Sequence, residues 1–197
     1  MTWAKERYSY IEKTGEKEIW FDWQLTQAQN QIVINSSQED EIFYTQCTPT
    51  GETREWIDKK DNDNSLKVKR EGNTLVIEST IDSHTINKRE ELDDSPWYQA
   101  LSFSLRPLLT SKNETETFWF VRSDNLDVIK LNATRMESSS PAGCSSSARR
   151  IEIRPVGLWA NFWHSSYWFQ EKNSVLCRYE GRHGLPGTPK TIITLQQ

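Results

Sequence analysis

The chain has 197 residues, and 24 Lys and Arg against 28 Asp and Glu give it a net charge of −4. This balance argues against a nucleic-acid partner, because affinity for a duplex depends on neutralising phosphates. The mean hydropathy is −0.77, and no run approaches the roughly 20 apolar residues of a membrane helix, so we expect no integral membrane protein. Aromatic residues make up 11% of the chain, which argues against disorder.

Short apolar runs separated by turn-forming residues recur along the first half of the chain. Tyr8–Ile11 and Glu18–Trp23 flank a turn at Gly15 and predict a β-hairpin. Pro49 and Gly51 mark another turn, since Pro presets φ and Gly allows a positive φ. The further strands predicted here are 31–34, 41–44, 53–58, 65–69 and 75–78. Close, regular spacing of such runs is typical of an antiparallel meander.

Residues 94–109 break this rhythm. Ser95 suits an N-cap and Pro96 the first helical position. Apolar residues then recur at helical spacing, namely Trp97, Ala100, Leu101, Leu105 and Leu108. The segment predicts one amphipathic helix from Pro96 to about Leu108, with its apolar stripe packed on the sheet.

Strand patterns return after this helix, over 117–122, 148–155, 175–180 and 190–195. The run Phe118–Val121 is apolar at every position. Both of its faces must therefore be covered, one of them by the helix or by whatever fills the concave side of the sheet. The Ser-rich segment Ser138–Ser147 has few anchoring groups, and we expect a mobile, dispensable hairpin loop.

The strand count sets the fold class. About eleven strands are expected, and open, twisted sheets rarely exceed about ten strands without curling or closing. We therefore expect a mainly β protein built as a single curved antiparallel sheet, a half-barrel or barrel-like meander, with one amphipathic helix packed on it. Residues 1–197 are expected to form a single β-rich domain, because no linker or repeat divides them.

The C-terminal strands carry a family resemblance. Trp168-Phe169, a short turn, the run Leu176–Gly181, a Gly/Pro-rich turn and Ile192–Leu195 resemble the end of bacterial envelope proteins of the DUF3108 type. Those proteins are similar to the LolA/LolB lipoprotein carriers, which are curved sheets around a hydrophobic cup with helical cover. The resemblance implies this fold and, by analogy, a lipid-like or apolar ligand.

Nine Trp residues are the most unusual feature of the composition. Seven lie in or beside predicted strands: Trp20, Trp23, Trp56, Trp119, Trp159, Trp163 and Trp168. Large aromatic side chains dominate both protein cores and binding surfaces. They either fill the interior of a wide sheet or line a cup for a flat or acyl ligand.

Arginines near these aromatic runs are candidates for the rim of such a cup. Arg122 and Arg178 each follow an apolar run, and an inward Arg can hold a carboxylate or phosphate bidentately. Arginines on solvated strand faces are the simpler alternative. We expect Trp119, Arg122, Trp163 and Arg178 to form one ligand site, with the arginines pairing with an acidic headgroup.

No motif of catalysis or metal binding is present. The three cysteines, Cys47, Cys144 and Cys177, are far apart and allow at most one disulfide; we expect Cys177 to be a buried free thiol. The three histidines lack metal-ligand spacing, and the nucleotide-binding and nucleophile motifs are missing. We expect no catalytic residue, no metal and no cofactor.

These features favour a non-catalytic binding or carrier protein with an aromatic-lined cup for a hydrophobic or amphiphilic ligand. A small enzyme acting on an aromatic or polyene substrate in the same cup and an interaction or scaffold protein are the alternatives. The N-terminus has no secretory signal as it stands, which predicts a cytoplasmic protein, or a periplasmic one if a signal peptide has been removed. The oligomeric state is open.

Overall fold

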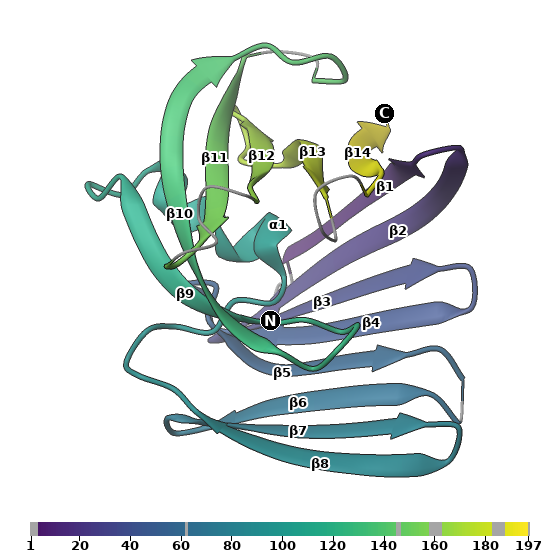
Figure 1. The fold of residues 1–197 in the computed structure, drawn as a ribbon. Coiled ribbons are helices and arrows are strands. Elements are labelled where there is room, and N and C mark those ends of the chain that lie inside the picture. The colour runs from purple at the N-terminus through teal and green to yellow at the C-terminus, as the bar shows by residue number, and fades with distance from the viewer. Residues whose placement is uncertain (1–3, 62, 145–146, 158–162, 183–187, 197) are drawn as a thin grey trace.

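The computed structural model describes residues 4–61, 63–144, 147–157, 163–182 and 188–196. Fourteen strands in these ranges form one antiparallel sheet in the order β8-β7-β6-β5-β4-β3-β2-β1-β14-β13-β12-β11-β10-β9 (Figure 1). The first half of the chain supplies β1 (Ala4–Thr14), β2 (Lys17–Ala28), β3 (Gln31–Gln38), β4 (Glu41–Cys47), β5 (Thr53–Lys59), β6 (Ser65–Glu71), β7 (Thr74–Ile81) and β8 (His84–Glu91). The second half supplies β9 (Thr115–Val121), β10 (Val128–Ser139), β11 (Ala148–Pro155), β12 (Ser165–Gln170), β13 (Leu176–Arg182) and β14 (Lys190–Gln196).

Most strands pair with their neighbours in the sequence, as short hairpin turns require, and the exception joins the two ends of the chain. β1 pairs with β14, with Tyr10 opposite Leu195. The terminal strands therefore lie inside the sheet, and β8 and β9 are its edges. The predicted mainly β fold, a single antiparallel sheet with one helix, is confirmed, although the helix is short. The residue pattern does not predict β8, because this strand is largely exposed and has no apolar alternation.

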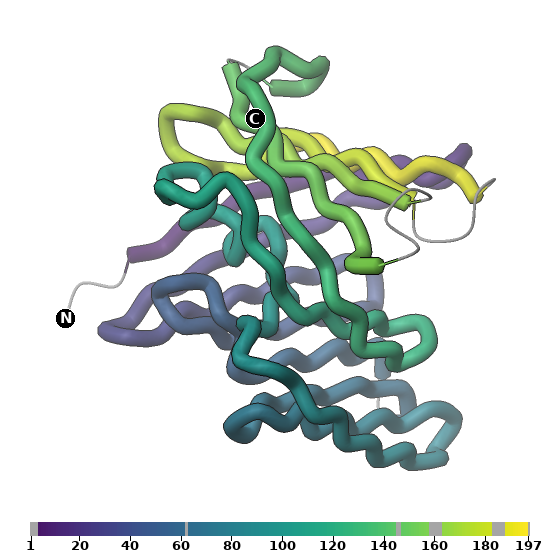
Figure 2. The backbone as a smooth tube through the Cα atoms, turned by 60° about the vertical axis from the view of Figure 1, so that its left-hand side comes forward, coloured from purple at the N-terminus to yellow at the C-terminus, as the bar shows by residue number. Residues whose placement is uncertain are grey.

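The sheet is strongly curved, as Figures 1 and 2 show, and the two faces of its edge strand β9 pack in two different hydrophobic clusters. One face of β9 carries Phe118 into the main core, which also holds Tyr10, Leu25, Leu105 and Ile153. The other face packs on β5–β7 in what we call the seam cluster: Trp56, Leu66, Val68, Leu75, Ile77, Leu92, Trp97 and Val121. The prediction that both faces of the run Phe118–Val121 are covered is confirmed.

A crossing segment, residues 96–99, joins β9 to β5 at this seam. The amide of Tyr98 donates to the Trp119 carbonyl (2.9 Å), the Trp119 amide donates to the Pro96 carbonyl (2.8 Å), and the Thr53 amide donates to the Trp97 carbonyl (2.8 Å). Gln99 extends the contact, since its side chain donates to the Val121 carbonyl and accepts from the Val121 amide. The segment thereby satisfies backbone groups that an open edge would leave unpaired.

The predicted helix from Pro96 to Leu108 is wrong in extent. The helical residues are only α1 (Leu101–Ser104) and the 3₁₀ turn η1 (Arg106–Leu109). Residues 96–99 are not helical: Trp97 forms a β-bridge with Trp119, and the backbone groups of residues 96–98 hydrogen-bond to β5 and β9. Trp97, Leu101, Leu105 and Leu108 of the predicted stripe are nevertheless buried, and Ala100 is half-buried. The apolar spacing therefore predicted which residues are buried better than it predicted their backbone conformation.

The turn between β4 and β5 packs directly against α1. Gly51 has a φ of +93°, and a Cβ at this position would lie 2.8 Å from the Ser104 Cα. The Ser104 hydroxyl donates to the Gly51 carbonyl at 2.6 Å. Glycine is therefore required here by both backbone conformation and close approach.

The segment Ser138–Ser147 is anchored, apart from residues 145 and 146, which lie outside the described residues. Cys144 forms a disulfide with Cys177, with Cα atoms 5.3 Å apart. The Trp168 indole donates to the Ser139 hydroxyl (3.0 Å), and Arg178 donates to the Ala142 carbonyl (2.8 Å). The expectation of a free thiol at Cys177 is wrong, and so is that of a loop with few anchoring groups, because partners distant in sequence hold the segment.

Gly51→Ala should destabilise the protein by about 3 kcal/mol, from strained φ together with the clash against α1. Gly72→Ala is the matched control: Gly72 also has a positive φ, +62°, but nothing lies within 4 Å of its added Cβ. It should cost only about 1 kcal/mol. Urea denaturation of both variants measures the difference, and equal losses would contradict the contact between Gly51 and α1.

Cys144→Ala should lower the free energy of unfolding by about 2–4 kcal/mol, because the disulfide closes a loop with a sequence separation of 33. The loss should appear in urea denaturation under oxidising conditions. Wild-type protein treated with dithiothreitol should match the variant, and dithiothreitol should not change the variant further. A wild-type midpoint that does not respond to reductant would show that the bond is absent or does not stabilise the fold.

Candidate functional site

A cavity of about 360 Å³ lies between α1 and the concave face of the sheet. Its walls come from both halves of the sheet and its floor from residues 99–102. The aromatic lining residues are Tyr10, Phe21, Trp23, Phe43, Trp56, Phe120, Tyr167 and Tyr179. The others are Glu12, Ile34, Ser36, Thr45, Gln99, Ala100, Leu101, Ser102, Leu176 and Ile193.

Strand register brings these residues together. Residues directly opposite each other in an antiparallel pair point to the same face of the sheet. Glu12 on β1 is opposite Ile193 on β14, and Ile193 is opposite Tyr179 on β13. Tyr179 is in turn opposite Tyr167 on β12. Four neighbouring strands thus contribute one row of side chains to the same wall of the cavity.

Gly181 makes room for one of these rings. It lies two residues after Tyr179 on β13, and a Cβ built there would meet the Tyr179 phenol. Any larger residue at 181 would displace the ring. The glycine therefore allows Tyr179 to lie along the strand and form part of the wall, where it is buried.

The tyrosine side chains of the cavity are neutral. Burial raises the pKa of Tyr10, Tyr167 and Tyr179 above the usual value of a phenol. The Tyr10 hydroxyl also donates to the Leu176 carbonyl at 3.1 Å. These rings supply apolar faces with few polar atoms.

Glu12 is the one charged side chain among the described residues that line the cavity. Arg106 lies behind one lining residue, with its guanidinium 5.5 Å from the centre of the Trp23 ring. Both carboxylate oxygens of Glu6 accept from Arg106, at 3.1 and 3.0 Å. The positive charge of Arg106 is therefore already balanced outside the cavity.

Asp58 lies on the same face as the cavity lining, opposite Phe43 across β4 and β5. Burial and the nearby Glu41 carboxylate raise the pKa of Asp58 to about 7, and Lys60 opposes this shift. Lys60 also lies 3.8 Å from Glu41. The concave face thus carries further acidic groups beyond Glu12.

The four residues predicted as the ligand site do not gather around this cavity. Trp119 packs on the seam cluster, and its indole donates to Asp93 at 2.9 Å. Arg122 is paired with Asp124. Trp163 packs against the main core and donates to the Arg182 carbonyl. Arg178 donates to Glu180 at 2.6 Å and to the Ala142 carbonyl.

Strand parity explains this outcome. Phe120 lines the cavity, so its neighbour Trp119 points to the other face; Tyr179 lines it, so Arg178 points away. Binding by Trp119, Arg122, Trp163 and Arg178 stays a prediction, and the geometry favours other residues. Of the tryptophans in the original set, Trp23 and Trp56 do line the cavity, whereas Trp159 lies outside the described residues.

The sequence contained a signal for the true lining. Tyr10 and Phe21 belong to the first predicted hairpin and are opposite each other across it, with ring centroids 5.3 Å apart. Alternation from this pair reaches Trp23 on the same face of β2. Distant partners such as Tyr167 and Phe120 cannot be found in this way, because their position depends on the curvature of the sheet.

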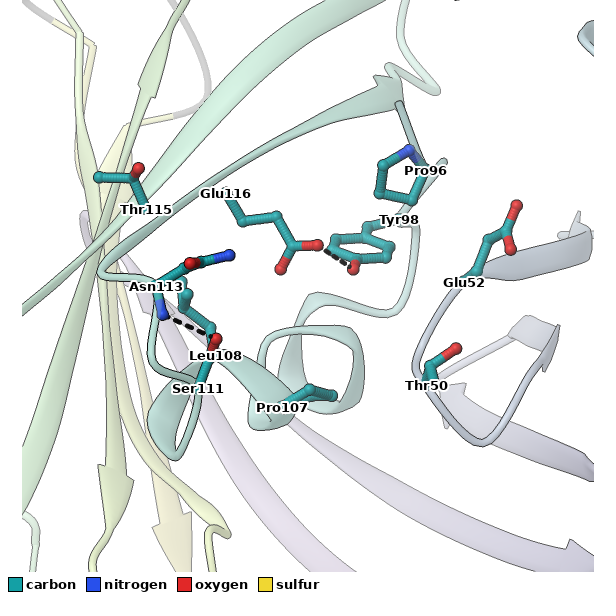
Figure 3. A pocket seen from close by; sticks show the side chains of 10 residues that line it. All are labelled: Thr50, Glu52, Pro96, Tyr98, Pro107, Leu108, Ser111, Asn113, Thr115 and Glu116. Atoms are coloured by element: carbon teal, nitrogen blue, oxygen red, sulfur yellow. Dashed lines mark hydrogen bonds between the residues drawn. The ribbon is translucent and has the colours of Figure 1, made fainter. Parts of the chain in front are cut away.

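A second cavity of about 380 Å³ lies beside the crossing segment and η1 (Figure 3). Its polar groups already have partners: the Tyr98 hydroxyl donates to Glu116 at 2.8 Å, and Glu52 accepts from Arg70, which is not one of the lining residues, at 3.0 Å. Its other lining residues are Thr50, Pro96, Pro107, Leu108, Ser111, Asn113 and Thr115. This lining is more polar than that of the first cavity, so the first is the better candidate for an apolar ligand.

The described residues contain no cluster of three or more His, Cys, Asp or Glu that could hold a metal ion.

The remaining thiol, Cys47, is buried, and burial raises its pKa to about 11, so it is not a reactive nucleophile. Within the described residues, the helices are too short and insufficiently apolar to cross a membrane.

Comparisons with known proteins show the fold. No family model and no curated protein matches the chain. A crystal structure from Brucella abortus, described as a β-barrel-like protein of the domain of unknown function DUF1849, matches with a TM-score of 0.62 and 8% identity. The match covers 97% of this chain and 95% of the other. The protein therefore shares the β-barrel-like fold of the DUF1849 structure.

Two further structures match more distantly. A LolA superfamily protein from Nitrosomonas europaea has a TM-score of 0.28 and 6% identity, over 98% of this chain and 83% of the other. A DUF1329 protein from Desulfovibrio piger has a TM-score of 0.29 and 7% identity, over 99% and 84%. The LolA superfamily is thus among the structural neighbours, at scores below those of a shared fold, and the resemblance to DUF3108 proteins stays a prediction.

Asp58→Asn should flatten the pH dependence of stability between pH 4 and 7. The folded chain keeps a proton on Asp58 up to about pH 7, whereas the unfolded chain releases it near pH 4. Wild-type stability should therefore fall as pH rises through this window. The variant should be more stable than wild type by about 1–2 kcal/mol at pH 7.5 and equal to it at pH 4, after discounting for partial exposure. A difference that is the same at both pH values, measured by urea denaturation, would contradict the shift.

Proposed function

We propose that the protein is a non-catalytic binding or carrier protein that holds a hydrophobic or amphiphilic ligand in the cavity above α1. The observation that carries the proposal is the composition of the cavity lining, in which eight aromatic side chains surround a volume of about 360 Å³. Small-molecule sites typically have volumes of about 300–1,000 Å³ and mostly apolar walls with a few polar groups.

The walls are built to keep their shape. Tyr10, Trp23, Trp56 and Tyr179 are buried although they border the cavity, and stacked or tilted ring contacts join Tyr10 to Phe21 and Tyr167 to Tyr179. A preformed apolar cavity avoids the ordering cost that a collapsed one would impose on its ligand. This supports binding of an acyl-chain-sized or flat apolar molecule.

The compartment is part of the proposal. The disulfide between Cys144 and Cys177 supports an oxidising environment, such as a periplasm or the cell exterior, because cytosolic thiols are kept reduced. We also propose that residues 1–197 fold as one domain, since a single sheet includes strands from both ends of the chain.

Ser36→Phe should weaken binding of the neutral fluorescent probe N-phenyl-1-naphthylamine at least about tenfold, because the new ring fills the cavity. Ser36 lines the cavity, whereas its neighbour Ser37 points to the opposite face of β3. Ser37→Phe is therefore the matched control and should bind like wild type. The measurement is a fluorescence titration on protein shown by circular dichroism to be folded. Absence of binding to the wild type, or equal affinity of the two variants, would overturn the proposal.

A further inference from the structure

We propose that the ligand carries a positive charge, as an amine or quaternary ammonium group that sits beside Glu12 among the tyrosine rings. This inference rests on the proposed binding function and specifies the ligand's chemical class. It reverses the expectation of an acidic headgroup held by arginines.

The first step is the state of the Glu12 carboxylate. Glu12 borders the apolar cavity, and none of the ion pairs among the described residues includes it. The Thr14 hydroxyl donates to it at a long 3.4 Å. The adjacent Lys13 points to the other face of β1 and pairs with Glu18 at 2.7 Å. The carboxylate therefore has acceptor capacity that a cation in the cavity can use.

The second step is the surroundings of this carboxylate. Tyr179 and Tyr167 follow Glu12 in the same row of the wall, and their rings lie 4.8 Å apart at 58°. Tyr10 lies two residues before Glu12 and stacks on Phe21. Neutral aromatic faces attract ammonium groups through their quadrupoles. A carboxylate with several aromatic rings is the combination that recognises an alkylated ammonium.

The third step is the absence of competing positive charge in the lining. The described lining residues include no Lys or Arg. Arg106, next to Trp23, is neutralised by Glu6, and Lys60, near Asp58, is balanced by Glu41. An anionic headgroup would meet Glu12 with no cation to offset it, because Arg122 and Arg178 pair with other carboxylates.

The test compares three amphiphiles with the same twelve-carbon chain, below their micellar concentrations at pH 8. Dodecyltrimethylammonium is cationic, dodecyldimethylamine oxide is neutral overall and dodecyl sulfate is anionic. Each displaces N-phenyl-1-naphthylamine from the protein. We expect the cation to bind tightest and the anion weakest, with about tenfold between the cation and the neutral compound.

Two variants assign the effect to Glu12. Glu12→Gln should weaken binding of the cation about tenfold and leave the neutral compound within twofold. Glu18→Gln removes an exposed carboxylate from the outer face nearby and should change neither. Both are compared by circular dichroism with the wild type, and retained binding of the neutral compound shows that the cavity is intact.

The outcomes separate this inference from the proposed function. If all three amphiphiles bind alike, or if Glu12→Gln does not change the preference for the cation, the ammonium site is overturned while a cavity for apolar chains stands. If neither N-phenyl-1-naphthylamine nor any amphiphile binds folded wild-type protein, the proposed function itself is overturned.

Discussion

The fold depends on how the edge strand β9 of the fourteen-stranded sheet is paired and covered. The edges of this sheet, β8 and β9, are not hydrogen-bonded to each other. The backbone groups at the β9 edge would be left unpaired, and the crossing segment pairs with them. Residues 96–99 pair with β9 on one side and β5 on the other, with Trp97 fully buried between them. This closure covers the second face of β9 and fixes α1 under the concave face. Without it the cavity would have neither a floor nor its wall at Phe120.

The cavity combines contributions that no single element could provide. Aromatic side chains arrive from both halves of the sheet because β1 and β14 are neighbours, which places Tyr10 beside the row of Tyr179 and Tyr167. Arg122 and Arg178, at the end of β9 and within β13, pair with nearby carboxylates outside the cavity. Among the described residues that line the cavity, Glu12 is then the one charged side chain in a largely aromatic and apolar wall, and both functional proposals follow from this combination.

Residue patterns determined the fold class. Alternation of apolar and polar residues and the turns at Gly and Pro indicated a meander, and a large strand count required it to curve. The fully apolar run at Phe118–Val121 required cover on both faces. These features are local, so each is visible in a short window of sequence. The sequence indicated aromatic residues as core or lining without deciding between the two, and Trp23 and Trp56, which belong to that set, line the cavity.

Tertiary structure decided the local conformations and the side-chain partners, because the residues that interact lie far apart in sequence. The apolar spacing that starts at Trp97 suits a helix, but residues 96–99 are not helical, because the backbone groups of residues 96–98 hydrogen-bond to β5 and β9. Cys144 meets Cys177 because the hairpin between β10 and β11 folds back on β13. Trp119 and Arg178 point away from the cavity because strand parity reverses at each residue. The sequence by itself specified a curved aromatic sheet; which side chains share its interior depended on register and closure.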